Sequence, residues 1–286
     1  MIVIKSPSRM LEAASRLKDP GGKSIGFVPT MGSLHEGHLS LARRARKEND
    51  IVVMSIFVNP SQFGPNEDYK KYPRDIRGDK RKAELAGVDI VFSPGVRQIY
   101  PEGYGSFVDV KELPGIMCGA SRPGHFKGVC TICAKLFYVV RPDIAYFGQK
   151  DYQQALILTR MVKDLDMGFK IKILPTIREK SGLALSSRNQ YLTCAQREKA
   201  AVIYESLKIG KALIDAGCKN TGRVKAVVRR MIKSKLGIKI DYISIVDPYT
   251  LREEKNINSK VLIAIAVFIG KTRLIDNILV GHNSRR

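Results

Sequence analysis

The stretch Pro29-Thr30-Met31-Gly32-Ser33-Leu34-His35-Glu36-Gly37-His38 decides the fold, because the chain changes there from the pattern of a strand to that of a helix. The preceding residues 25–28 are apolar and predict a short buried strand. We expect Pro29 to end this strand, since proline donates no backbone hydrogen bond. Gly32 then permits a tight turn that a Cβ atom would crowd.

The second half of this stretch has the pattern of a helix start. Ser33 and Glu36 have the spacing of a capping box, which predicts a helix that begins near Leu34. The first N–H groups of a helix are unpaired and its dipole is positive there, so this end can receive a phosphate. His35 and His38 are three residues apart and therefore share one face just above it. The stretch thus indicates a nucleotide-binding site.

A zinc site is the first alternative for these histidines. The zinc-protease pattern needs two histidines four residues apart, whereas here they are three apart around Gly37. Of the four histidines in the chain, only His125 and His282 remain as a third nitrogen ligand. Cys130 and Cys133 form a close pair, but no second pair completes a zinc site, so we expect them to pack in the core. The metal ligands therefore stay unassigned, and ordinary helix-start residues are the remaining alternative.

Length and composition are those of a soluble protein with a real core. The chain has 286 residues, of which 44% are hydrophobic, and this length favours two domains. The longest apolar run, residues 261–269, is about half of what a bilayer crossing requires, and residues 1–4 are too short for a signal-peptide core. We therefore expect a cytoplasmic protein without a membrane partner. Five cysteines in such a chain favour reduced thiols over disulfides.

The strongest oddity of the composition is its charge. A net charge of +22 suits either nucleic acid or small polyanionic substrates. Residues 219–239 contain eight basic side chains and no acidic one, but their apolar residues keep a helical spacing. No aromatic residues alternate with these charges, as a platform for stacking bases would need. We therefore expect a solvated helix face rather than a specific nucleic-acid site.

Strand and helix patterns alternate through residues 1–176. Such alternation is typical of an α/β domain with a doubly wound, mainly parallel sheet, and ligands bind such sheets beyond the carboxyl ends of the strands. The predicted strands are residues 2–4, 25–28, 51–58, 89–92, 144–147 and 170–174, and the predicted helices include residues 74–86, 129–140 and 152–165.

The pattern changes after Pro175, where residues 177–286 predict a smaller α+β domain. Its expected helices are residues 194–216 and 221–236, and its expected strands are residues 240–246, 261–269 and 273–280. The short connection 270–272 makes the last two strands an antiparallel pair.

Polar side chains gather in four separate loops and suit attack on the α-phosphate of ATP. This attack builds charge on the leaving pyrophosphate, which His35, His38, Lys150 and Arg188 can stabilise. Glutamine amides donate and accept without charge, so Gln62 and Gln154 suit the hydroxyls and carboxylate of a small substrate. The four loops contain His35 and His38; Asn59, Gln62 and Gly64; Lys150, Asp151 and Gln154; and Ser186, Ser187 and Arg188.

Motifs along nearly the whole chain resemble a known family. His35-x-Gly-His38 resembles the signature of adenylate-forming nucleotidylyltransferases, and the longer pattern is similar to the pantothenate synthetase (pantoate–β-alanine ligase) family. The matching stretches are residues 29–38, Asn59-Pro60-Ser61-Gln62-Phe63-Gly64, Tyr72-Pro73-Arg74-Asp75, Arg122-Pro123-Gly124-His125-Phe126, residues 147–154, Ser186-Ser187-Arg188-Asn189 and Thr272-Arg273-Leu274-Ile275-Asp276-Asn277.

The resemblance implies a Rossmann-like first domain that holds the substrates, a second domain that closes over them, and a homodimer. It implies that His38 is the catalytic acid, that Gln62 and Gln154 hold pantoate, and that Gln62 also contacts β-alanine. Leu185 stands where we expect Met, a replacement of similar volume. The implied ATP-binding residues are Met31, Gly32, Ser33, Leu34, His35, Glu36, Gly37, His38, Gly148, Gln149, Lys150, Asp151, Ile177, Leu185, Ser186, Ser187 and Arg188.

The activity implied by the resemblance is an ATP-dependent condensation of (R)-pantoate with β-alanine. It proceeds through pantoyl adenylate and releases pyrophosphate and AMP, with Mg²⁺ arriving on ATP and bound largely by its phosphates. Two alternatives stay open. One is a nucleotidylyltransferase that stops after adenylyl transfer, and the other is a basic nucleic-acid-binding protein.

Overall fold

The computed structural model describes residues 1–19, 22–65 and 67–281, and these fall into two compact units. The first unit comprises Met1–Gly115, Gly119–Gln149 and Gln154–Pro175, and the second comprises Ile116–Cys118, Lys150–Gln153 and Thr176–Arg286. None of the helices in the described ranges combines the length and apolar content that a bilayer crossing needs.

The first unit contains a sheet of six strands, all parallel where they pair, in the order β1-β4-β3-β2-β5-β6. The order reverses between β2 and β5, which is the switch point of a doubly wound sheet. The predicted α/β class is therefore confirmed. The strands are β1 (Ile2–Ile4), β2 (Ile25–Thr30), β3 (Ile51–Ile56), β4 (Ile90–Phe92), β5 (Ile144–Gly148) and β6 (Lys170–Leu174).

Strand β2 continues through Pro29, so the prediction that this proline ends the strand is wrong. Pairing of β2 with β5 stops at Phe27, whereas pairing with β3 continues to Thr30. The amide of Thr30 points toward β3, because it donates to Ser55. Neighbouring amides of a strand point to opposite sides, so the N–H that Pro29 lacks belongs to the side without a partner strand.

Helices pack on both faces of this sheet. Successive side chains of a strand point to opposite faces, so the apolar residues of β2 need a helix on each side. Val28 belongs to a buried cluster with Leu41 and Ala45 of α2. Its neighbour Phe27 instead packs edge-on against Phe137 of α6, with 6.2 Å between ring centroids. The helices of the chain are α1 (Pro7–Lys18), α2 (Glu36–Glu48), α3 (Ile76–Leu85), α4 (Val96–Ile99), α5 (Cys118–Ser121), α6 (His125–Val140), α7 (Tyr152–Asp164), α8 (Cys194–Ala200), α9 (Val202–Asp215) and α10 (Thr221–Lys233).

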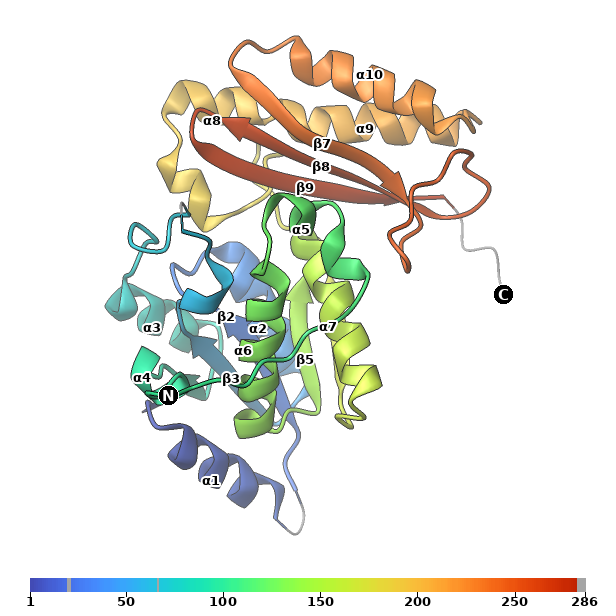
Figure 1. Ribbon diagram of the computed structural model, residues 1–286. Coiled ribbons are helices and arrows are strands. Elements are labelled where there is room, and N and C mark those ends of the chain that lie inside the picture. The colour runs from blue at the N-terminus through green and yellow to red at the C-terminus, as the bar shows by residue number, and fades with distance from the viewer. Residues whose placement is uncertain (20–21, 66, 282–286) are drawn as a thin grey trace. The chain divides into compact units, whose positions relative to one another are not determined.

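The second unit contains an antiparallel sheet of β7 (Ile238–Val246), β8 (Val261–Ile269) and β9 (Thr272–Val280). The predicted antiparallel pair is confirmed, since Ile269 and Thr272 pair across a two-residue turn. Helices α9 and α10 lie side by side over one face of this sheet (Figure 1). Alternate residues of β8 pack there against α9 and α10, which gives the unit its own core.

The single helix predicted over residues 194–216 is instead two helices, α8 and α9. They divide at Ala201, whose amide donates to the carbonyl of Glu198, three residues back rather than four. This tighter bond interrupts the regular α-helical ladder while keeping helical backbone angles.

The five cysteines are free, as the sequence predicts. Cys130 and Cys133 lie in α6 with 0% and 5% of their surface exposed. Burial raises the pKa of the Cys130 thiol to about 12, so it stays protonated. The prediction that this pair packs in the core is confirmed.

Helix α10 carries most of the basic run and is amphipathic. Val224, Val228 and Ile232 are fully buried, whereas Arg229 and Arg230 are exposed. The apolar stripe therefore packs on the sheet, and the charge lies on the opposite face.

We expect this basic face to bind duplex DNA weakly and without sequence preference, because it offers charge without aromatic stacking partners. Raising salt from about 50 to 200 mM should then weaken binding by roughly tenfold or more, as counterion release requires. Fluorescence anisotropy with labelled duplexes of two unrelated sequences measures this. Tight binding that distinguishes the two duplexes at the higher salt would contradict the interpretation.

Close packing between α6 and the short helix η1 (Pro60–Gln62) requires Gly128. A Cβ atom at this position would lie 2.3 Å from the carbonyl oxygen of Ser61 and 2.7 Å from the amide nitrogen of Gln62. We expect Gly128→Ala to lower the free energy of unfolding by about 1 to 3 kcal/mol, the usual cost of overpacking. Gly115→Ala is the control, because a Cβ atom there meets nothing within 4 Å. Equal urea midpoints for the two variants would show that η1 can move away from the new methyl group without loss of stability.

Candidate active site

The turn between β2 and α2 is held by a buried carboxylate. Gly32 and Ser33 both have positive φ, at 86° and 51°. This backbone directs two successive N–H groups the same way, and those of Ser33 and Leu34 donate to the carboxylate of Asp79 at 2.8 and 2.7 Å. Asp79 is only 1% exposed. Burial raises its pKa, and the two backbone hydrogen bonds oppose that rise.

Helix α2 begins at Glu36 and not near Leu34, so the prediction that Ser33 caps it is wrong. An N-cap residue needs extended backbone angles, which Ser33 lacks and His35 has, with φ −131° and ψ 172°. The reciprocal half of the capping box is also displaced, since His38 accepts from the His35 amide. Two N–H groups expected to receive a phosphate are therefore occupied by Asp79.

The two histidines lie together at the start of α2. Their rings stack with 4.0 Å between centroids and 26° between planes. His38 Nδ1 accepts from the His35 amide at 3.4 Å, so the neutral His38 ring carries its proton on Nε2. This geometry gives the turn a half-buried N–H group that can donate to a phosphoryl oxygen.

Gln62 lies in the same unit and is held from two sides. Its Oε1 accepts from Asn59 Nδ2 at 3.0 Å, and its Nε2 lies 3.2 Å from the sulfur of Met31. Asn59 is fixed in turn by the hydroxyl of Tyr100, which donates to Asn59 Oδ1 at 2.7 Å. The structure thus brings together two predicted site residues, Met31 from the β2–α2 turn and Gln62 from η1.

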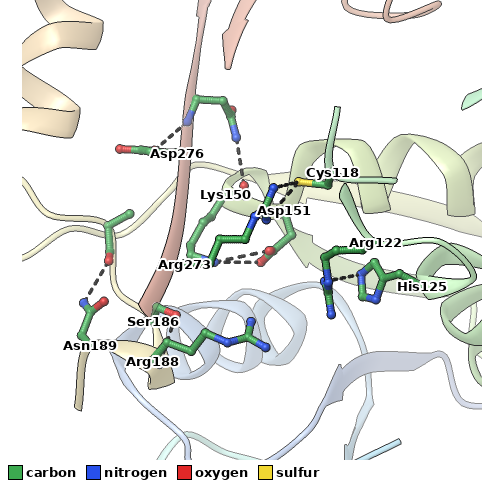
Figure 2. A network of polar contacts seen from close by, with 12 residues as sticks. Cys118, Arg122, His125, Lys150, Asp151, Ser186, Arg188, Asn189, Arg273 and Asp276 are labelled. Carbon is green, nitrogen blue, oxygen red and sulfur yellow. Dashed lines mark hydrogen bonds and ion pairs between the residues drawn. The ribbon is translucent and has the colours of Figure 1, made fainter. Parts of the chain in front are cut away.

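Arg122 and His125 support the backbone of Gln62. His125 Nδ1 lies 2.8 Å from the Gln62 carbonyl oxygen, and its Nε2 lies 2.9 Å from a guanidinium nitrogen of Arg122 (Figure 2). Since arginine only donates, His125 accepts at Nε2 and donates from Nδ1. Arg122 also forms a two-bond ion pair with Glu67, at 2.7 and 2.5 Å.

The second unit holds Lys150 by its backbone. Asn277 Nδ2 donates to the Lys150 carbonyl oxygen at 2.9 Å, and the Asn277 amide donates to Asp276 at 2.8 Å (Figure 2). Asp276 is 3% exposed and accepts two bonds from Arg178, at 2.5 and 3.0 Å. Burial raises the pKa of Asp276, and Arg178 opposes this rise. The Lys150 ammonium itself lies 3.3 Å from the Asp151 carboxylate.

The serine-rich segment of the second unit follows a small hairpin. The amide of Leu185 donates to the carbonyl of Ile177 at 3.0 Å, so these two predicted site residues pair. Ser186 then caps the short helix η4 (Ser187–Tyr191) by accepting from the Arg188 amide at 3.3 Å.

Each predicted site residue can now be placed within its own unit. Gln154 lies in the first turn of α7 and is half-buried. The first unit contains Met31, Gly32, Ser33, Leu34, His35, Glu36, Gly37, His38, Gln62, Gly148, Gln149 and Gln154, and the second contains Lys150, Asp151, Ile177, Leu185, Ser186, Ser187 and Arg188.

Two supporting residues, Asp79 and Arg178, are not among the site residues that the sequence predicts. Asp79 lies 46 residues after Ser33, and Arg178 lies 98 residues before Asp276. Two signals could have led to them: Asp79 is an acidic residue within the predicted helix 74–86, and Asp276, the partner of Arg178, stands within the family motif 272–277.

The described ranges, with gaps at 20–21 and 66 and an end at 281, contain no cluster of three His, Cys, Asp or Glu side chains that could hold a metal ion. His282, a ligand considered for the zinc alternative, lies outside the described residues.

Similarity to known proteins extends over nearly the whole chain. The family model for pantoate-beta-alanine ligase matches residues 2–279. The pantothenate synthetase of Moorella thermoacetica is 54% identical over 92% of this chain and 93% of that protein. A crystal structure of pantothenate synthetase from Thermus thermophilus superposes with a TM-score of 0.94 and 42% identity, covering 99% of this chain and 100% of that one.

A third comparison concerns a protein with bound small molecules. The pantoate-beta-alanine ligase of Francisella tularensis, complexed with beta-gamma ATP and beta-alanine, has a TM-score of 0.80 and 38% identity to this chain. The match covers 98% of this chain and 97% of that one. From its sequence and its fold, the chain belongs to the pantoate–β-alanine ligase family.

Proposed function

We propose that this protein condenses (R)-pantoate with β-alanine at the expense of ATP, releasing pyrophosphate and AMP. The observation that carries the proposal is the stacked pair of His35 and His38 at the carboxyl end of β2, beside the switch point of a parallel sheet. Ligands bind such sheets at this place. The Francisella tularensis relative is complexed with beta-gamma ATP and beta-alanine, which supports ATP and β-alanine as two of the proposed substrates.

In the first step, a carboxylate oxygen of pantoate attacks the α-phosphorus of ATP. The new P–O bond forms as the bond to pyrophosphate breaks, which gives pantoyl adenylate. His38 donates through Nε2 to the phosphoryl oxygens where negative charge builds. We assign to His35, Lys150 and Arg188 the stabilisation of the same negative charge. The remaining predicted ATP contacts would orient the nucleotide.

In the second step, the amine of β-alanine attacks the acyl carbon and AMP leaves with the carboxylate oxygen. Gln62 suits contact with both substrates, because its amide is held at a fixed place by Asn59. Fixing the reacting groups in this way lowers the entropic part of the barrier. We assign Gln154 to the pantoate carboxylate, since it is half-buried in the first turn of α7.

Magnesium enters in this proposal as part of the ATP substrate. Mg²⁺ prefers phosphate oxygens and keeps several waters in such sites.

We extend the proposal to the domains and the assembly. Residues 1–176 would bind the substrates, and residues 177–286 would complete the ATP site and close over it. The family resemblance supports a homodimer, which sedimentation at two protein concentrations would test.

The proposed order of steps predicts a partial reaction. With β-alanine omitted, labelled pyrophosphate should exchange into ATP only when pantoate is present, because adenylate formation is complete and reversible without the amine. With all substrates present, AMP and pantothenate should form in equal amounts. Exchange without pantoate, or a stable adenylylated final product, would favour a simple nucleotidylyltransferase instead.

The assigned role of His38 predicts that its replacement by alanine greatly slows the pyrophosphate exchange. His38→Ala should slow the exchange by about 10²-fold, the scale lost with a positioned acid or charge-stabilising donor. Arg44→Ala is the control on the same helix, because Arg44 forms an i,i+4 pair with Glu48 near the far end of α2. Near wild-type exchange by folded His38→Ala protein would remove this histidine from the mechanism.

A further inference from the structure

Two side chains of α3, three residues apart, form hydrogen bonds with the backbone of the β2–α2 turn. Asp79 accepts from the amides of Ser33 and Leu34 at 2.8 and 2.7 Å. Lys82 donates from Nζ to the Leu34 carbonyl oxygen at 2.9 Å. Both polar groups of the Leu34 backbone are therefore bound by α3, immediately before the two histidines.

The turn is shaped to admit this carboxylate. A Cβ atom at Gly32 would lie 3.0 Å from Asp79 Oδ2 and 3.0 Å from Ile56 Cγ2, so a side chain there would crowd the acid. Ser33 and Leu34 are only 6% and 3% exposed. Asp79 therefore provides hydrogen-bond acceptors to two amides that are shielded from water, and such groups are costly to leave without a partner.

The bonds to Asp79 also set the point where α2 begins. They accompany the positive φ of Ser33, which keeps that residue out of the helix and leaves the N-cap place to His35. His38 then accepts from the His35 amide, and this bond assigns the proton of His38 to Nε2. A shift in the turn would therefore change the direction in which His38 can donate.

We propose that Asp79 is a positioning residue for the reaction, acting through the β2–α2 turn on His35 and His38. This inference rests on the proposed function and deepens it. Asp79 is too deeply buried to touch a substrate, so it contributes by fixing the histidines in place.

Asp79→Asn tests the proposal, because the amide keeps the shape of the acid but not its two acceptors. Its oxygen can accept from one backbone amide, while its NH₂ group faces the other donor. We expect kcat for the exchange reaction to fall about tenfold or more, as expected for a misplaced catalytic group. KM for pantoate should change by less than about twofold, since Gln62 and Gln154 are not bonded to Asp79.

Asp143→Asn is the matched control. Like Asp79, Asp143 accepts from a backbone amide, that of Ile25 at 2.7 Å, and it further accepts from Lys18 Nζ at 2.6 Å, but it lies at the opposite end of β2. We expect this variant to lose stability and to keep its exchange rate at temperatures where it is folded. Equal effects of the two variants on kcat would overturn the positioning role.

A double variant shows whether Asp79 acts through His38. If it does, Asp79→Asn should slow the His38→Ala variant by much less than it slows the wild-type protein, because residues that act as a unit are not additive. Multiplying losses would overturn the proposal.

The ¹⁵N spectra of the histidine rings give a readout that needs no substrate. In the wild-type protein, His38 should show an unprotonated Nδ1 that accepts a hydrogen bond, and Asp79→Asn should shift this signal whereas Asp143→Asn should not. Unchanged spectra in Asp79→Asn would contradict the positioning role. Absence of exchange in the wild-type protein, with the predicted spectra present, would instead contradict the proposed function alone.

Discussion

The carboxylate of Asp79 inside the β2–α2 turn is the interaction on which the candidate active site of the first unit depends. It accepts hydrogen bonds from two buried amides of this turn, those of Ser33 and Leu34. A parallel sheet places its loops at one edge, but it does not fix the angle at which a helix leaves that edge. Asp79 holds the backbone of the turn that leads into α2, and the stacked histidines lie at the start of that helix.

Other polar loops follow the same physical rule, since a buried polar side chain needs a partner to offset its desolvation. Asn59 holds Gln62, and the pair of Asp276 and Arg178 holds Asn277 and through it the Lys150 backbone. The Arg178–Asp276 and Asn277–Lys150 contacts join parts of the second unit that are 98 and 127 residues apart, whereas Asn59 and Gln62 lie three residues apart in one loop. Removing Arg178 from its pair with Asp276 would leave a buried carboxylate without its compensating charge, which is strongly destabilising.

The architecture could be predicted from the sequence because it depends on patterns that are local. Apolar runs of strand length alternate with amphipathic helices in the first unit, and the two-residue turn between β8 and β9 sets an antiparallel pair. The start of α2 could not be predicted in this way. Ser33 and Glu36 have a genuine capping spacing, but Asp79 competes for the Ser33 amide from 46 residues away.

The continuation of β2 through Pro29 could not be predicted from local sequence either. A proline is tolerated there because pairing with β5 has already stopped at Phe27. Asn59, His125 and Asn277, which hold other site residues, stand within the family motifs, but the sequence did not indicate what each of them contacts. Asp79 and Arg178 stand outside those motifs. Asn277 reaches the Lys150 carbonyl across 127 residues, and no periodicity or local motif encodes such a contact.

The most direct test of the acyl-adenylate account follows an oxygen atom. Pantoate labelled with ¹⁸O in its carboxylate should be incubated with ATP, magnesium, β-alanine and the protein, and the released AMP analysed by mass spectrometry. The account predicts one ¹⁸O atom in the phosphoryl group of AMP, because the oxygen that attacks the α-phosphorus leaves with it when the amide forms. AMP without the label, or label in pyrophosphate, would contradict the account.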